Sequence, residues 1–108
     1  MHITDEQVEK ALDFLRDGAE TIGAAKERLV KAEHMVKHIK AIEMKRCIYP
    51  QVGQQEREAI ASDAYHAAIM EEAVAAGEYE KMKAIREAAA LKIEVWRSMS
   101  ANYRSMKI

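Results

Sequence analysis

The sequence predicts an all-α protein, folded as a long antiparallel helical hairpin with a coiled-coil-like seam and assembled into an oligomer. Three observations support this fold class. The 108 residues include one proline and four glycines, while 32% are charged, a composition typical of long helices. Apolar residues recur three and four positions apart along most of the chain. The longest stretch without a charged residue covers nine positions, 47–55, so no membrane-spanning helix is expected.

The first helix is expected over residues 4–47. Thr4 and Gln7 are spaced as a capping box, which marks its start. An apolar stripe follows at Val8, Leu12, Leu15, Ala19 and Ile22. Near Gly23 its phase shifts, and it resumes as Ile22, Ala25, Leu29, Ala32, Val36 and Ile39. Because Gly18 and Gly23 each weaken a helix by roughly 1 kcal/mol relative to Ala, a bend or short break is expected there.

The second arm is expected to be helical over residues 55–106, after a loop at 48–54. Pro50 excludes helical backbone at Tyr49, and Gly53 permits a turn. A break is expected near residue 62, where Ser62 is a suitable N-cap. The apolar stripe of this arm is Met82, Ile85, Ala89, Ile93, Trp96, Met99, Tyr103 and Met106.

No repeat or linker divides the chain, so residues 1–108 are assigned to one helical domain. Two long arms joined by a short loop form an antiparallel hairpin, whose core is one seam wide. We therefore expect a second copy of the chain to cover that core.

The formal net charge of −1 hides two basic segments. Residues 26–46 carry seven basic and three acidic groups, and residues 92–108 carry four and one. On a helical wheel the face opposite the first stripe gathers cations, and we expect no acid among them: Lys26, Lys31, His34, Lys37, His38 and Lys45. Such a face suits a phosphate backbone, although most runs of charge are simply solvated helix surface.

Near the C-terminus, Arg86, Arg97 and Arg104 fall in one row beside Trp96 and Tyr103. Arginines next to aromatic rings suit single-stranded nucleic acid, whereas helical spacing of aromatics equally predicts core positions. The predicted nucleic-acid-binding residues are Lys26, Lys31, Lys37, Lys40, Lys45, Arg46, Arg97 and Arg104.

No catalytic residue, cofactor or metal site is predicted, so the chain is not expected to be an enzyme. His34 and His38 are four residues apart, but no third and fourth ligand accompany them. Cys47 has no identifiable general base and is treated as a small apolar residue. One cysteine and an N-terminus without signal-peptide features indicate a cytoplasmic protein.

Residues 91–104 read Leu-Lys-Ile-Glu-Val-Trp-Arg-Ser-Met-Ser-Ala-Asn-Tyr-Arg, which resembles the end of small helical phage and prophage proteins. The order of segments also resembles the UvsY-type recombination mediator of T-even phages. Both have an N-terminal helix, a basic stretch before a loop, an acidic middle and a long C-terminal helix. This resemblance implies single-strand binding, oligomerisation and recombinase loading, and it places the basic stretch at Lys37, Lys40, Lys45 and Arg46.

The leading expectation is therefore a non-enzymatic phage accessory protein of DNA recombination. It would bind single-stranded DNA and assist a phage recombinase or annealing protein as a homo-oligomer. The alternative is a helical hairpin that binds and inhibits a host protein, such as a defence nuclease. A purely structural coiled-coil subunit is the third interpretation.

Overall fold

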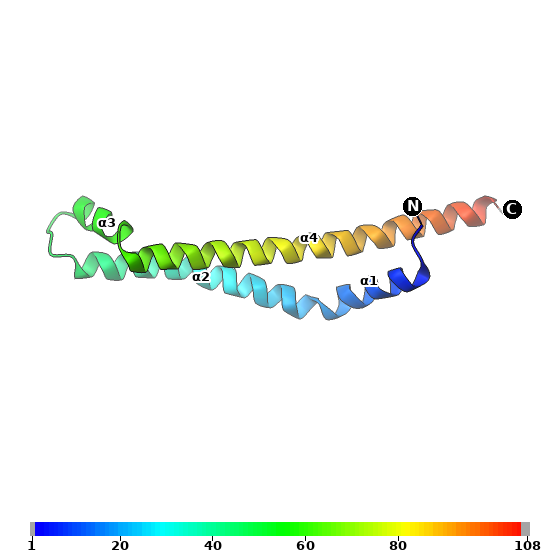
Figure 1. Cartoon of the computed structure of the whole chain (residues 1–108), viewed down its shortest axis with the longest axis horizontal. Helices are drawn as coiled ribbons and strands as arrows, with labels where there is room; N and C mark the ends of the chain where they lie inside the picture. The colour runs from blue at the N-terminus through cyan, green and yellow to red at the C-terminus, as the bar shows by residue number, and fades with distance from the viewer. Residues whose placement is uncertain (1, 107–108) are drawn as a thin grey trace. The chain divides into compact units, whose positions relative to one another are not determined.

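The computed structural model describes residues 2–106, which form four α-helices and no strand. They are α1 (Asp5–Asp17), α2 (Ala19–Arg46), α3 (Val52–Ile60) and α4 (Asp63–Met106) (Figure 1). The predicted all-α hairpin is confirmed. The chain divides into two compact units, which are described separately. The terminal unit comprises Met1–Gly23 and Glu80–Ile108, and the loop unit comprises Ala24–Tyr79.

The capping box at the start of α1 is confirmed. The backbone N–H of Gln7 donates to Thr4 Oγ1 over 3.2 Å, and the backbone N–H of Thr4 donates to Gln7 Oε1 over 3.0 Å. Two donors at the helix start, which have no partner within the helix, are thereby satisfied. Asp5 and Glu6 in the first turn add a favourable interaction with the helix dipole.

The single helix expected over residues 4–47 is divided into two helices, α1 and α2. They are interrupted at Gly18, whose N–H donates to the carbonyl oxygen of Phe14 over 2.7 Å. A Cβ atom at Gly18 would lie 2.6 Å from that same oxygen, so only glycine fits without a shift. At Gly23, the other expected site of a bend, α2 continues without interruption.

The seam of the first arm differs from the expected stripe. Leu12 is 50% exposed and Ala19 is also exposed, whereas Ala11 is buried beside Val8. Gly18, which lies two seam positions after Ala11, is half-buried. The buried and half-buried positions therefore alternate by three and four without a phase shift: Val8, Ala11, Leu15, Gly18, Ile22, Ala25, Leu29, Ala32, Val36 and Ile39.

The apolar stripe predicted for the second arm is only partly removed from water. Met82, Ala89, Ile93 and Trp96 are half-buried. The other four predicted members are exposed: Ile85, Met99, Tyr103 and Met106. In the terminal unit, α1 packs beside the C-terminal part of α4, and its buried residues include Ile3, Val8, Ala11 and Ile22.

In the loop unit, α2 and α4 run antiparallel around a narrow core (Figure 1). Leu29, Ala32 and Ala75 form this core, and Ala76 and Tyr79 pack against it. Small side chains at Ala32 and Ala75 let the two helices approach closely, at the expense of apolar area removed from water.

The loop between the arms is shorter than expected. It covers residues 47–51, and α3 already begins at Val52, so Gly53 lies inside a helix with ordinary negative φ. The predicted break near residue 62 is present, and Ser62 caps α4. Its Oγ accepts from the N–H of Tyr65 over 3.2 Å and donates to the carbonyl oxygen of Ala59 over 2.7 Å.

Within residues 2–106, no helix combines the length and the apolar character needed to cross a membrane.

Candidate nucleic-acid interface and neighbouring surfaces

The predicted basic face lies on α2, in the loop unit. Its members Lys37, Lys45, His34 and His38 are exposed, and among the described residues none of their side chains has a hydrogen-bond or ion-pair partner. Lys31 lies on the same side of the helix. We call the five residues, Lys31, His34, Lys37, His38 and Lys45, the outer face of α2.

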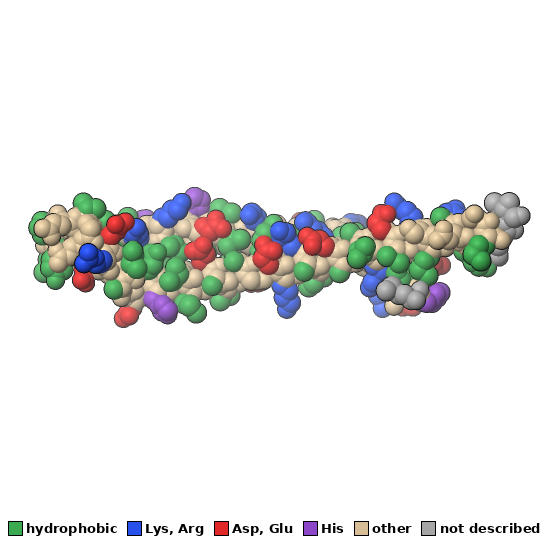
Figure 2. Space-filling view, turned by 90° about the horizontal axis from the view of Figure 1, so that it is seen from above, with side chains coloured by type: hydrophobic (Ala, Val, Ile, Leu, Met, Phe, Trp, Pro, Cys, Tyr) green, Lys and Arg blue, Asp and Glu red, His purple; other side chains and the backbone are tan. Residues whose placement is uncertain are grey.

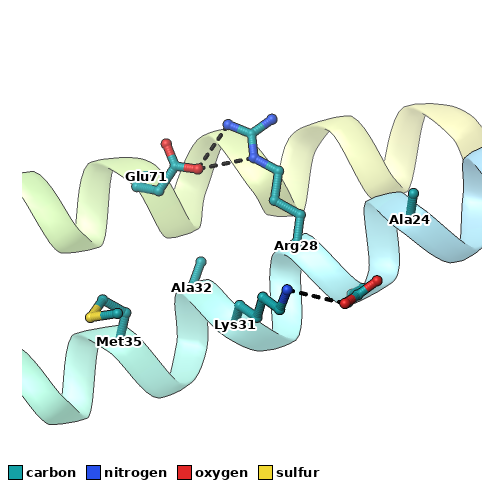
Figure 3. A pocket seen from close by; sticks show the side chains of 7 residues that line it. Ala24, Arg28, Lys31, Ala32, Met35 and Glu71 are labelled. Atoms are coloured by element: carbon teal, nitrogen blue, oxygen red, sulfur yellow. Dashed lines mark hydrogen bonds and ion pairs between the residues drawn. The ribbon is translucent and has the colours of Figure 1, made fainter.

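One acid accompanies this outer face, contrary to the expectation. Glu27 is four residues before Lys31, and its carboxylate pairs with Lys31 Nζ at 3.1 Å (Figure 3). Both side chains are well exposed, so the pair is screened by water and contributes little to stability. Beyond Lys31, a second acid borders the outer face: Glu33 is exposed and lies four residues before Lys37, although the described residues show no ion pair between them.

Lys40 belongs to a structural ion pair and not to the outer face. Its Nζ lies 2.8 Å from Glu56 Oε1 on α3, and the Lys40 side chain is only 32% exposed. The hydrogen bond to Glu56 raises the pKa of Lys40, and the same bond lowers the pKa of Glu56. Because the carboxylate of Glu56 compensates its charge, Lys40 would attract a phosphate only weakly.

Three further predicted residues are also engaged. Lys26 Nζ lies 5.0 Å from the centre of the Tyr79 ring, a cation–π arrangement across the two helices. Arg46 pairs with Glu43 at 3.4 Å, and Arg97 in the terminal unit pairs with Glu94 at 3.2 Å. The three cationic side chains are themselves exposed, so each keeps part of its capacity for anions.

Arg28 is the residue that sequence reasoning missed. Its guanidinium donates to Glu71 Oε1 over 3.0 and 2.8 Å (Figure 3). It also donates to Glu78 Oε2 over 2.6 Å, so that Arg28 bridges α2 to two turns of α4. These carboxylates raise the pKa of Arg28 above its ordinary value. The available signal is an arginine beside the seam of one arm and acidic residues beside the seam of the other.

A shallow apolar groove accompanies this ion bridge. It encloses about 380 Å³ and is lined on α2 by Ala24, Ala32 and Met35 and on α4 by Glu71. Met35 is 50% exposed, and Met70 and Val74 on α4 are exposed to a similar degree. Figure 2 shows hydrophobic side chains at the surface between charged ones. The loop unit therefore presents apolar side chains to water next to a charged bridge.

The C-terminal arginines belong to the terminal unit. Arg86 is exposed, while Arg104 lines a groove of about 530 Å³ with Trp96, Met99 and Tyr103. Trp96 is half-buried, and its indole Nε1 donates to Asp5 Oδ1 over 3.0 Å. The Trp96 ring therefore lines an open groove on one side and is covered by neighbouring residues on the other.

The eight predicted binding residues divide between the two units. Six belong to the loop unit, and Arg97 and Arg104 belong to the terminal unit, so each set is considered on its own. Among residues 2–106, no three His, Cys, Asp or Glu side chains are grouped so as to hold a metal ion.

Comparison with protein-family models finds no match, and comparison with curated proteins and with solved structures finds no significant match either.

Proposed function

We propose that this protein is a non-enzymatic binding protein for single-stranded DNA, which it contacts through the outer face of α2. The observation that carries the proposal is the set of exposed cations without carboxylate partners, above all Lys37 and Lys45. Cations that are not neutralised within the protein release counterions from a phosphate backbone when they bind it. The accessory role in phage recombination that the sequence resemblance implies would rest on this activity.

The structure narrows the set of residues that supports this proposal. Lys37 and Lys45 are the strongest candidates, Lys31 shares its charge with Glu27, and Lys40 is committed to Glu56. The outer face carries no Phe, Tyr or Trp, and its only rings are the imidazoles of His34 and His38, so phosphate contacts rather than base stacking would dominate binding there. We therefore expect little preference for base sequence.

The direct test is fluorescence anisotropy of a labelled oligothymidine across a salt series. The double variant Lys37→Glu/Lys45→Glu should bind much more weakly than the native chain. Neutral replacement at the same two positions should reduce the slope of log affinity against log salt by about 0.7 for each phosphate that the variant no longer neutralises. Circular dichroism checks that helicity is retained.

A matched control changes the same charge elsewhere. Arg57 on α3 and Lys81 on α4 are exposed, and Arg57→Glu/Lys81→Glu alters the net charge as much as the test variant does. The control should retain most of the affinity. Equal reductions in both variants would show that only net charge matters, and absence of binding by the native chain at low salt would refute the proposal.

A protein partner is the second candidate, favoured by the exposed Met35, Met70 and Val74 beside the Arg28 bridge. Methionine-rich surfaces adapt to apolar partner side chains. A photocrosslinker at Met70 should then give one discrete adduct in the producing cell, and Met35→Glu/Val74→Glu should abolish it.

A further inference from the structure

The terminal unit has two adjoining hollows on one side of the α1–α4 pair. The larger, about 480 Å³, is lined by Ile22 and Met82, and the smaller, about 290 Å³, is lined by Ala11 and Ala88. Phe14 and Ile85 line both hollows and form the ridge between them, and Lys10, whose Nζ lies 3.8 Å from Glu6 Oε1, also lines both. Ile85 is 45% exposed, so an apolar ridge reaches water between two apolar depressions.

The charges at the two ends of this surface have opposite sign. Asp13 and Asp17 line only the larger hollow, and Lys92 lines only the smaller one. Arg16 contacts both aspartates, at 3.2 and 2.9 Å, so that end keeps one net negative charge. Lys92 has no carboxylate partner among the described residues.

We infer that this surface binds the same surface of a second copy of the chain around a two-fold axis. Turning one copy end for end places Lys92 of each copy against the Asp13 and Asp17 end of the other. The two Phe14–Ile85 ridges then lie close to the axis on opposite sides of it, so that each fills the larger hollow of the other copy. A surface with one positive end, one negative end and, at its middle, an apolar ridge beside the Lys10–Glu6 pair is complementary to itself in this orientation.

The chain as a whole exposes more surface than a compact monomer of its mass. The chain exposes 8254 Å², whereas a folded monomer of its 12.2 kDa exposes about 6100 Å². The excess is roughly 2000 Å², and a standard interface removes about 800 Å² from each partner. The inference is independent of DNA binding, because the outer face of α2 belongs to the loop unit.

The first experiment is sedimentation equilibrium of the full chain at micromolar concentrations. The native chain should have twice the monomer mass, and Ile85→Asp should shift it to the monomer. Leu91→Asp is the matched control, because Leu91 is 64% exposed on the same helix and lines neither hollow. A monomeric native chain, or a dimer equally tolerant of both variants, would overturn the inference.

Charge exchange tests the end-for-end orientation. Lys92→Glu and Asp17→Lys should each weaken the dimer, because each creates two like-charge contacts across the axis. A mixture of the two variants should form heterodimers at least tenfold more readily than either forms homodimers. Failure of the mixture to recover association would exclude this orientation.

Disulfide trapping provides a measurement that does not depend on weakening the dimer. In a Cys47→Ser background, Ile85→Cys should form an intermolecular disulfide under mild oxidation because residue 85 lies near the axis. Leu91→Cys should not. Equal crosslinking at both positions would contradict the proposed interface.

Discussion

The indole Nε1 of Trp96 donates a 3.0 Å hydrogen bond to the carboxylate of Asp5, a residue 91 positions earlier in the chain. The bond joins the first turn of α1 to α4 within the terminal unit. Trp96 is therefore held by a polar contact at one edge, while its ring is half-buried by packing. These two contributions to stability are separable by substitution.

Trp96→Phe should remove the hydrogen bond and keep most of the ring, at a cost of about 1 kcal/mol in the free energy of unfolding. Trp96→Ala should cost about 2–3 kcal/mol, because truncating a half-buried ring costs less than the 3–5 kcal/mol of a core aromatic. Urea denaturation measures both. In a double-mutant cycle, Trp96→Phe and Asp5→Ala should be clearly non-additive, and additive effects would show that the bond contributes nothing.

The glycines of the first arm should respond in opposite directions to alanine. Gly18→Ala places a Cβ atom 2.6 Å from the Phe14 carbonyl oxygen, so we expect destabilisation by about 1–3 kcal/mol as the backbone shifts. Gly23 is inside α2 with no atom within 4 Å of the added Cβ, and Gly23→Ala should stabilise by about 0.5–1 kcal/mol.

Thermal unfolding followed by circular dichroism compares the two variants at equal concentration. Gly77→Ala, at another open position in α4, is a second control and should behave like Gly23→Ala. Stabilisation by Gly18→Ala would mean that α1 and α2 form one continuous helix, and that the break at Gly18 is not required.

Features that depend only on residues close together in the sequence were predicted correctly. The caps at Thr4 and Ser62 follow from side chains that satisfy nearby backbone groups, and both are present. The seam was displaced by one position in the first arm, because Ala11 and Gly18 are too small to stand out beside Leu12. Helix packing favours these small residues because they allow close approach.

Contacts between distant elements escaped sequence reasoning. Lys40 looks like any lysine of a basic stretch until α3 brings Glu56 to within 2.8 Å of it. Arg28 likewise becomes a bridge only when α4 places Glu71 and Glu78 beside it. Helical periodicity gives the side of a helix on which a residue lies, but it does not give the axial register of the opposite arm.

The Lys40–Glu56 pair should make stability depend on pH at both extremes. The pKa of Glu56 lies below its ordinary 4.5, so its contribution is present above pH 4.5 and is lost as pH falls through the lowered pKa. The pKa of Lys40 lies above its ordinary 10.5, so its contribution is complete below pH 10.5 and is lost as pH rises through the raised pKa.

A double-mutant cycle with Lys40→Met and Glu56→Gln, followed by urea denaturation, should show favourable coupling at pH 7 and none at pH 2.5. Glu94 and Arg97, an exposed pair within α4, provide the matched cycle, whose coupling should be smaller at pH 7. Coupling of Lys40 and Glu56 that persisted unchanged at pH 2.5 would show that packing of their aliphatic parts, and not their charges, joins α2 to α3.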